Sequence, residues 1–187
     1  MMFVRRSIRL VMVPIAGAAL AALPACEDGR ENLHPVCEVR PPTILMAESV
    51  RSASRVPCIR SLPLGWEWGS FHAEAGGSAF VLGSTSGGDS ALTVRLVPRC
   101  SVDATATRSD PEGVVMRERV ISREPYLADR TYSFEGGCAL VRVAFASGAP
   151  VDELLRDIDR SIGFLERSAI DAGLRSQTDR RLDPVDV

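Results

Sequence analysis

The sequence of 187 residues predicts an α+β fold, with an antiparallel sheet of about five or six strands and C-terminal helices packed on one face of the sheet. Two observations support this prediction. Between residues 66 and 145, short alternating apolar runs are separated by glycine-rich segments, a pattern typical of strands joined by hairpins. From Pro150 onward the apolar residues recur at helical spacing, which indicates helices at the C-terminal end.

The strand candidates follow one another along the middle of the chain. They span residues 66–73, 79–83, 92–96, 114–121 and 130–135. The clearest hairpin covers 132–141, where Gly136 and Gly137 supply two turn residues that tolerate positive φ. With this turn, Phe134 lies opposite Ala139.

Helices are predicted on both sides of the strands. Residues 43–56 form a short helix candidate that Pro57 ends. In the C-terminal helix, Pro150 takes the first position and an apolar stripe follows. Ser168 is the expected N-cap of a second short helix. The stripe consists of Val151, Leu154, Leu155, Ile158, Ile162 and Leu165.

The first 25 residues have the features of a lipoprotein signal peptide. Three arginines precede fourteen uncharged residues at 10–23, a run shorter than the roughly 20 residues that span a bilayer. The run leads into Leu23-Pro24-Ala25-Cys26, which resembles a bacterial lipobox, although Pro24 replaces the commoner small residue. In such signals the cysteine receives a diacylglycerol and the preceding bond is cut. An uncleaved N-terminal anchor and an ordinary signal peptide are the alternatives.

Cleavage before Cys26 removes three arginines and no acidic residue, so the mature chain is more acidic than the whole chain, whose net charge is −2. An acidic domain of this kind is not expected to bind nucleic acid. We expect it outside the cytoplasm, held at the cell membrane by the lipid on Cys26. Residues 26–42 are the expected membrane tether, 43–177 a single domain, and 178–187 a flexible tail.

Four cysteines follow the lipobox: Cys37, Cys58, Cys100 and Cys138. An even number in an exported chain predicts two disulfides. Of the three possible pairings we favour Cys37 with Cys58 and Cys100 with Cys138, because each pair then tethers a local region. A zinc site is less favoured, since the H-x-x-C spacing of His34 and Cys37 has no second pair of ligands. We therefore expect no metal and no cofactor.

Trp66, Trp68 and His72 are the candidate ligand-binding residues. The alternation of a strand places them on one face with Ser70, where the indole rings can stack on a sugar or an aromatic ligand. The alternative is a core face, on which the tryptophans fill volume beneath the C-terminal helices. The sequence contains no nucleophile elbow, H-E-x-x-H, Walker loop or dinucleotide fingerprint, so no catalytic residue is assigned.

Three motifs and one cysteine lie between residues 56 and 138: VPCI at 56–59, LPLGW at 62–66, Cys100, and YSFEGGC at 132–138. Together they resemble an uncharacterised group of exported or membrane-attached proteins of GC-rich bacteria, over residues 56–167. The group has no assigned activity, so the resemblance implies no catalytic residue. It implies the pairing of Cys100 with Cys138.

The sequence therefore favours a membrane-anchored lipoprotein with a non-enzymatic domain that binds a partner protein or another component of the cell envelope. Two alternatives stay open. One is an envelope hydrolase that uses His72 with an acid brought near by folding. The other is a carrier that holds a small sugar or apolar ligand between the sheet and the helices.

Overall fold

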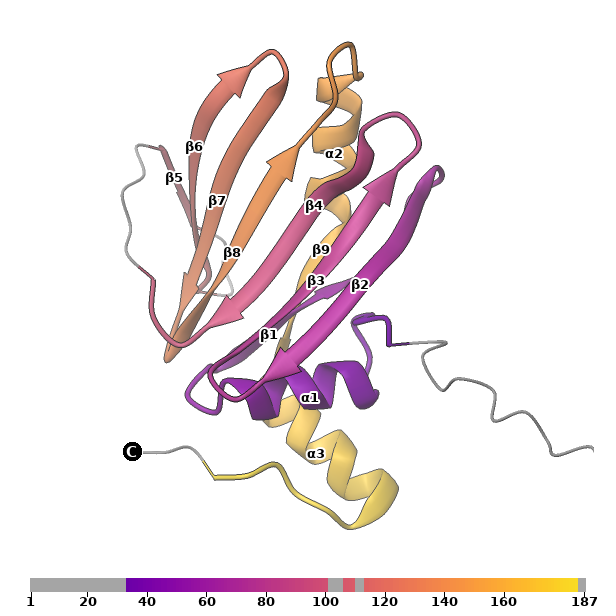
Figure 1. Cartoon of the computed structure of the whole chain (residues 1–187). Helices are drawn as coiled ribbons and strands as arrows, with labels where there is room; N and C mark the ends of the chain where they lie inside the picture. Colours follow the sequence, from indigo (N-terminus) through magenta and orange to yellow (C-terminus); the bar gives the residue numbers. More distant parts are fainter. Residues whose placement is uncertain (1–32, 101–105, 110–112, 185–187) are drawn as a thin grey trace, which may run out of the picture. The chain divides into compact units, whose positions relative to one another are not determined.

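The main sheet consists of seven antiparallel strands in the part of the chain that the computed structural model describes, residues 33–100, 106–109 and 113–184 (Figure 1). Their order is β2-β3-β4-β8-β7-β6-β5. They are β2 Trp66–Glu74, β3 Gly77–Ser84, β4 Gly88–Val97, β5 Ala106–Ser109, β6 Val115–Arg123, β7 Tyr126–Phe134 and β8 Gly137–Ala144. The antiparallel sheet is confirmed, and the short β5 is the strand that apolar alternation does not mark.

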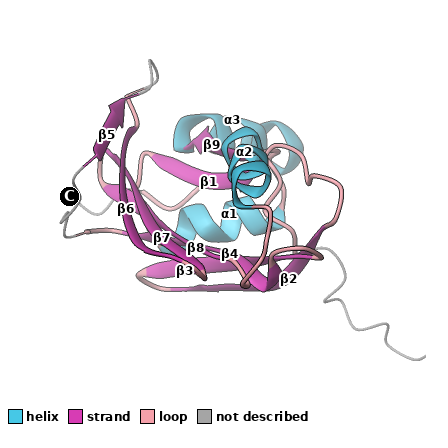
Figure 2. Ribbon diagram, turned by 90° about the horizontal axis from the view of Figure 1, so that it is seen from above, coloured by secondary structure: helices cyan, strands magenta, loops and turns pink. Residues whose placement is uncertain are grey.

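A layer of helices and a two-stranded ribbon covers one face of this sheet (Figure 2). The helices are α1 Pro41–Ser49, α2 Val151–Ser161 and α3 Arg167–Thr178, and the ribbon pairs β1 Arg55–Ile59 with β9 Ile162–Glu166. The C-terminal helices thus lie on one face, as expected for the α+β fold, and α1 lies on the same side. Figure 2 shows the opposite face of the sheet without a covering helix or strand among the described elements.

The hydrophobic core lies between the sheet and this layer. Successive side chains of a strand point to opposite faces, and in the central strands every second residue is buried. The sheet contributes Phe80, Leu82, Leu92, Val94, Leu96, Val141 and Val143, and the covering layer contributes Met46, Ile59, Ile158 and Ile170. Each of these side chains is at most 1% exposed, so the alternation seen in the sequence marks the core face correctly.

The first helix begins and ends earlier than predicted, at Pro41–Ser49 instead of 43–56. Pro41 and Pro42 occupy its first turn, where the missing N–H has no intrahelical partner to lose. Thr43 anchors this turn, because its Oγ1 donates to the carbonyl oxygen of Glu38 at 2.7 Å. The two prolines therefore start the helix.

Pro57 lies inside β1 and does not end a helix. The N–H of Ile59 donates to the carbonyl of Pro35 at 2.8 Å, on the side away from β9. The N–H of Arg60 donates to the carbonyl of Ser161 at 2.8 Å, on the side of β9. Because these directions alternate along a strand, the nitrogen of Pro57 points away from β9, where proline removes no bond from the ladder.

The predicted apolar stripe is wrong for its last two members. Helix α2 ends at Ser161, and Ile162 and Leu165 belong to β9, where they pair with Ile59 and Val56. Those two residues of β1 are fully buried, so pairing with a core strand overrides the helical spacing. Helix α3 then begins at Arg167, so Ser168 lies within its first turn and is not the N-cap.

The predicted hairpin is present with a register shifted by two residues. Phe134 pairs with Gly137 and not with Ala139, so Glu135 and Gly136 form the turn. Gly136 has a φ of +72°, and a Cβ at this position would overlap the carbonyl group of Ser52. Because the shift is even, the core face of the two strands is the predicted one.

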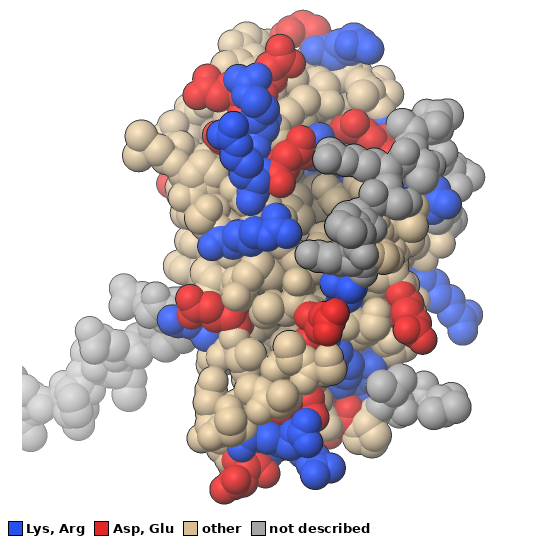
Figure 3. Space-filling view, turned by 180° about the vertical axis from the view of Figure 1, so that it is seen from behind, with Lys and Arg blue, Asp and Glu red and all other residues tan. Residues whose placement is uncertain are grey.

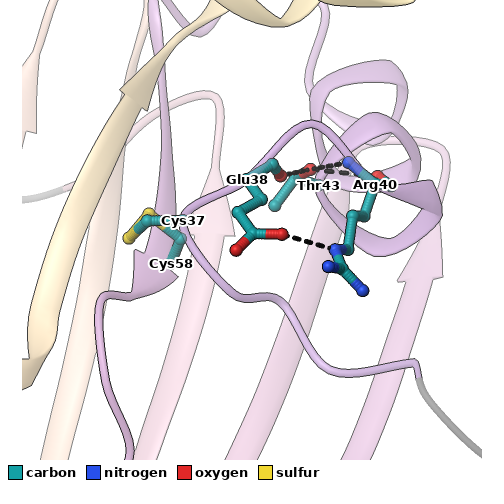
Figure 4. The surroundings of a disulfide bond; sticks show 5 residues. All are labelled: Cys37, Glu38, Arg40, Thr43 and Cys58. Atoms are coloured by element: carbon teal, nitrogen blue, oxygen red, sulfur yellow. Dashed lines mark hydrogen bonds and ion pairs between the residues drawn. A yellow bond between two sulfur atoms is a disulfide. The ribbon is translucent and has the colours of Figure 1, made fainter.

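Both favoured disulfides are present, Cys37–Cys58 and Cys100–Cys138, with sequence separations of 21 and 38 residues. The first joins the segment before α1 to β1 (Figure 4). Beside it, the Nε of Arg40 lies 2.6 Å from the Oε2 of Glu38. The segment 37–42 of the expected tether is thus bonded to the domain, while 26–32 lies outside the described residues.

The segment after α3 also contacts the domain. Leu182 is 8% exposed, and its N–H donates to the Oδ1 of Asp171 at 3.0 Å. The N–H of Asp183 donates to the Oε1 of Glu48 at 2.8 Å, and its carbonyl accepts from Arg167 at 2.8 Å. Within the expected tail 178–187, these bonds hold the chain against α1 and α3 as far as residue 183.

Candidate ligand-binding cleft

A β-bulge in β2 separates His72 from the two tryptophans. The pairing of β2 with β3 shifts between Trp68 and Phe71, so Phe71 takes the inward position that simple alternation assigns to Ser70. The shared face predicted for the tryptophans, Ser70 and His72 is therefore wrong. Gly69 is the sequence signal for the bulge, because an isolated glycine inside a strand often marks one.

Trp66 and Trp68 belong to the core side of β2. Trp66 is 7% exposed, and its Nε1 donates to the Oδ2 of Asp157 on α2 at 3.2 Å. The indole ring of Trp68 stacks on the ring of His34, with centroids 4.7 Å apart and 4° between the planes. The structure thus agrees with the alternative in which both tryptophans pack beneath the covering layer.

His72 lies on the outer side of the sheet. Its Nε2 is 3.4 Å from the Oε2 of Glu74, and the two side chains are 68% and 72% exposed. Together with Arg95 they line a depression of about 180 Å³ beside the β2–β3 turn. The carboxylate of Glu74 therefore lies near His72, and both side chains are open to solvent.

A different set of residues lines a cleft between the main sheet and the ribbon, with a volume of about 240 Å³. Figure 3 views the molecule from this side, over which arginine and acidic side chains are mixed. The lining residues are Val114, Met116, Tyr132, Asp159, Ile162, Phe164 and Arg60. Four of them are aliphatic or phenylalanine side chains and three are polar or charged, so the cleft offers apolar and polar surface in similar proportions.

Phe164 of β9 forms the aromatic part of the cleft. Its ring contacts Tyr132, with centroids 5.3 Å apart, and Phe134, with centroids 5.8 Å apart in an edge-on arrangement. Phe134 also lines a second hollow of about 430 Å³ with Ser54 and Glu166. The cleft and this second hollow therefore both border β9, and the rings of Tyr132, Phe134 and Phe164 line them.

Arg130 fixes the polar part of the cleft from within the protein. Its side chain is 5% exposed, its Nε donates to the Oε1 of Glu118 at 2.8 Å, and one terminal nitrogen donates to the Oδ1 of Asp159 at 2.6 Å. Burial alone lowers the pKa of Arg130, but Tyr132 and the two carboxylates together raise it above its usual value. Arg130 thus stays charged and holds Asp159 at the cleft.

Tyr132 and Arg60 are the other polar groups of the cleft. Burial raises the pKa of the Tyr132 phenol, although Arg130 acts in the opposite direction, so the phenol stays protonated at neutral pH. Arg60 is exposed, and it makes no side-chain hydrogen bond or ion pair with another residue that the structure describes. Its side chain crosses Gly163, where a Cβ would lie 2.9 Å from the Cγ of Arg60.

The cleft therefore combines apolar walls, a neutral phenol and an unpaired guanidinium. Asp159 bonds Arg130 through its Oδ1 and is 50% exposed, whereas Arg60 lines the cleft with no partner among the described residues. The lining residues come from four separate segments of the sequence, and neither periodicity nor motif brings them together before folding. Among the described residues, no group of three or more His, Cys, Asp or Glu side chains could hold a metal ion.

The predicted lipidation site, Cys26, lies outside the described residues. Within the ranges that are described, no helix is long and apolar enough to cross a bilayer. The two disulfides fit a domain outside the cytoplasm, where such bonds persist. In comparisons with protein-family models, curated proteins and solved structures, nothing matches this chain.

Proposed function

We propose that this chain is a lipid-anchored protein of the cell envelope whose domain binds a small ligand in the cleft between β6, β7 and β9. Among the functions that the sequence left open, this combines the anchored binding protein with the carrier. One observation carries it: the cleft combines apolar walls with the phenol of Tyr132 and with Arg60, which has no side-chain partner among the described residues. Small-molecule sites are typically concave and apolar, with a few placed polar groups that fix the ligand's orientation.

The ligand that fits this arrangement has an apolar body and one anionic group. Phe164, Met116 and Ile162 offer surface to the apolar part, and a planar guanidinium such as that of Arg60 binds a carboxylate or phosphate through two parallel hydrogen bonds. The neutral phenol of Tyr132 adds a hydrogen-bonding group without a competing negative charge. A volume of about 240 Å³ suits a compact molecule.

Anchoring rests on the lipobox that ends at Cys26. We expect cells grown with radiolabelled palmitate to label this chain and to hold it in the membrane fraction. The variant Cys26→Ala should lose both the label and the membrane association, because it lacks the thiol that receives the lipid. A Cys26→Ala chain that is labelled as strongly as the wild type would contradict anchoring and leave the cleft unaffected.

Ligand binding is tested by native mass spectrometry of the chain purified from its own membranes. We expect a retained small molecule, which Met116→Trp should expel because the indole fills the cleft, and which Arg60→Gln should weaken. Val120→Trp is the matched control, since Val120 lies on the same strand, is 42% exposed and does not line the cleft. Equal retention by a folded Met116→Trp protein would contradict the proposal.

The hydrolase alternative has the support of one contact, the 3.4 Å approach of His72 to Glu74. The two side chains lie outside the cleft and are largely exposed, so they offer little of the dry environment in which charge stabilisation is effective. If loss of the gene has a phenotype, we expect His72→Ala to restore the wild type. A failure to complement, with normal protein level, would favour hydrolysis.

A further inference from the structure

The uncovered face of the main sheet carries four arginines in two adjacent rows. Arg95 of β4 pairs with Leu140 of β8, which pairs with Thr131 of β7, which pairs with Arg117 of β6. Directly paired residues point to the same face of a sheet. Arg95 and Arg117 therefore lie in one row across four strands.

The neighbouring row contains two more arginines and one acid. Arg142 of β8 pairs with Asp129 of β7, and Asp129 pairs with Arg119 of β6. Each of these three residues is two positions along its strand from a member of the first row, so both rows share one face. Over β4, β8, β7 and β6, these two rows of the described chain thus contain four cations and a single anion.

Asp129 neutralises only part of this charge. Its Oδ1 accepts from the Nε of Arg142 at 2.9 Å, and its Oδ2 accepts from Arg119 at 3.3 Å. Arg142 and Arg119 are still 60% and 54% exposed, so their remaining N–H groups face solvent. Arg95 and Arg117 have no side-chain hydrogen bond or ion pair within the described part of the chain. The centre of this face is therefore positively charged.

The spacing of the arginines suits a linear partner with repeated negative groups. Neighbouring strands lie about 4.8 Å apart, so Arg142 and Arg119 are separated by about 10 Å, and Arg95 and Arg117 by about 14 Å. Along β6, the two arginines are about 7 Å apart. Guanidinium groups bind carboxylate and sulfate groups through paired hydrogen bonds. We propose that this face binds an acidic polysaccharide that lies across the strands.

A membrane surface fits these observations less well. In Figure 2 the sheet curves around the covering layer, so its outer face is convex and offers a flat bilayer little contact. The exposed large apolar side chains of the described residues are Leu45, Leu64, Val120 and Ile121, and none of them belongs to the two rows. The disulfides fit a domain outside the cytoplasm, where such bonds persist, and this favours a glycan over a nucleic acid.

The test measures binding of the full chain, in detergent, to immobilised polygalacturonate, with neutral dextran as the reference surface and heparin as a second anionic probe. We expect binding to both anionic glycans and none to dextran. The affinity should fall by roughly tenfold or more between 50 and 200 mM salt, because each contact releases counterions. Arg95→Gln/Arg117→Gln should weaken binding about tenfold, because it removes two guanidinium groups that would bind anionic groups of the chain at a solvent-exposed surface.

Two variants distinguish binding by this particular face from a general effect of the protein's net charge. Arg156→Gln/Arg160→Gln removes the same two charges from exposed positions on α2, on the opposite side of the sheet, and should leave binding within twofold. Asp129→Asn should strengthen binding severalfold, because it releases Arg142 and Arg119. Met116→Trp should bind like the wild type, which keeps this result independent of the cleft.

Three outcomes would overturn the proposal. The first is equal weakening by the two double-arginine variants, which would leave only an effect of net charge. The second is the absence of binding to either anionic glycan at low salt. The third is binding only to vesicles of phosphatidylglycerol and phosphatidylcholine, which would assign the face to a membrane.

Discussion

Each face of the main sheet carries a cluster of arginine and carboxylate groups; the arginine of the covered face is buried, and the arginines of the outer face are exposed to solvent. Asp129 and Arg130 are neighbours on β7, yet one points outward and the other toward the covering layer. Inside, Arg130 is 5% exposed and is shared by Glu118 and Asp159. Outside, Asp129 is 27% exposed and is shared by two arginines that are more than half exposed.

This comparison shows that burial decides whether an ion pair stabilises the fold or leaves its groups available to a binding partner. A buried charge that loses its partners has little water to replace them, so breaking the inner network destabilises the fold. An exposed pair is screened and contributes little to stability, so the outer arginines are available for a partner. The inner arginine holds Asp159 at the cleft, and the outer ones give the opposite face its charge.

The largest effect is expected from removing both inner carboxylates. Glu118→Gln/Asp159→Asn leaves Arg130 buried without a counter-charge, which typically costs about 3–5 kcal/mol. Urea unfolding followed by circular dichroism measures this loss of unfolding free energy. A loss below about 1 kcal/mol would show that water reaches Arg130, and the contrast between the two faces would then fail.

Asp129→Asn is the matched change on the outer face, and its effect should be small. The pKa of Asp129 lies below its usual value, chiefly because Arg142 donates a hydrogen bond to it and against a smaller opposing effect of burial. Its contribution to stability is therefore present above the unfolded pKa and is lost as the pH falls through the folded one. At pH 7 we expect a loss of about 1 kcal/mol or less in urea unfolding.

The tyrosines sharpen the comparison through their ionisation. The chain has two, Tyr126 and Tyr132, and burial raises the pKa of both above the usual value near 10. Stability from the protonated phenols is thus fully present below about pH 10 and is lost as the pH rises through the folded pKa values. Phenolate absorbance should appear at higher pH in the native chain than in urea, and coincident titrations would contradict this.

The tryptophans provide the smallest and simplest test of the inner face. Both indole rings of the chain, those of Trp66 and Trp68, lie on the core side of β2. Iodide should therefore quench their fluorescence much less in the folded chain than in urea. Equal quenching in the two states would show that a tryptophan is exposed to solvent. It would then support the prediction from the sequence that these indole rings stack on a sugar or an aromatic ligand.

Local patterns predicted the parts of the fold that depend on local physics. Alternation marks the core face of the strands, glycines mark the turns, and the count of cysteines indicates the two disulfides. Tertiary pairing decides the rest. Ile162 and Leu165 fit a helical stripe but pair with β1, and the bulge before Phe71 turns His72 to the other face.

The cleft could not be predicted for the same reason. Arg60, Met116 and Phe164 are far apart in the sequence and meet only because the ribbon lies over β6 and β7. The two rows of arginines likewise depend on the registers of four strands. In each case the residue types are ordinary, and their relative positions give the surface its chemistry.

Site-specific photocrosslinking in living cells tests the central claim, that the cleft of the covered face holds a small ligand. A diazirine amino acid whose side chain is close to methionine in size would replace Met116 in the cleft, Val120 on the same strand, or Leu140 on the outer face. After irradiation, mass spectrometry of the purified chain should show a small-molecule adduct at position 116 and none at positions 120 and 140. Adducts of equal yield at 116 and 120, or none at 116, would contradict the claim.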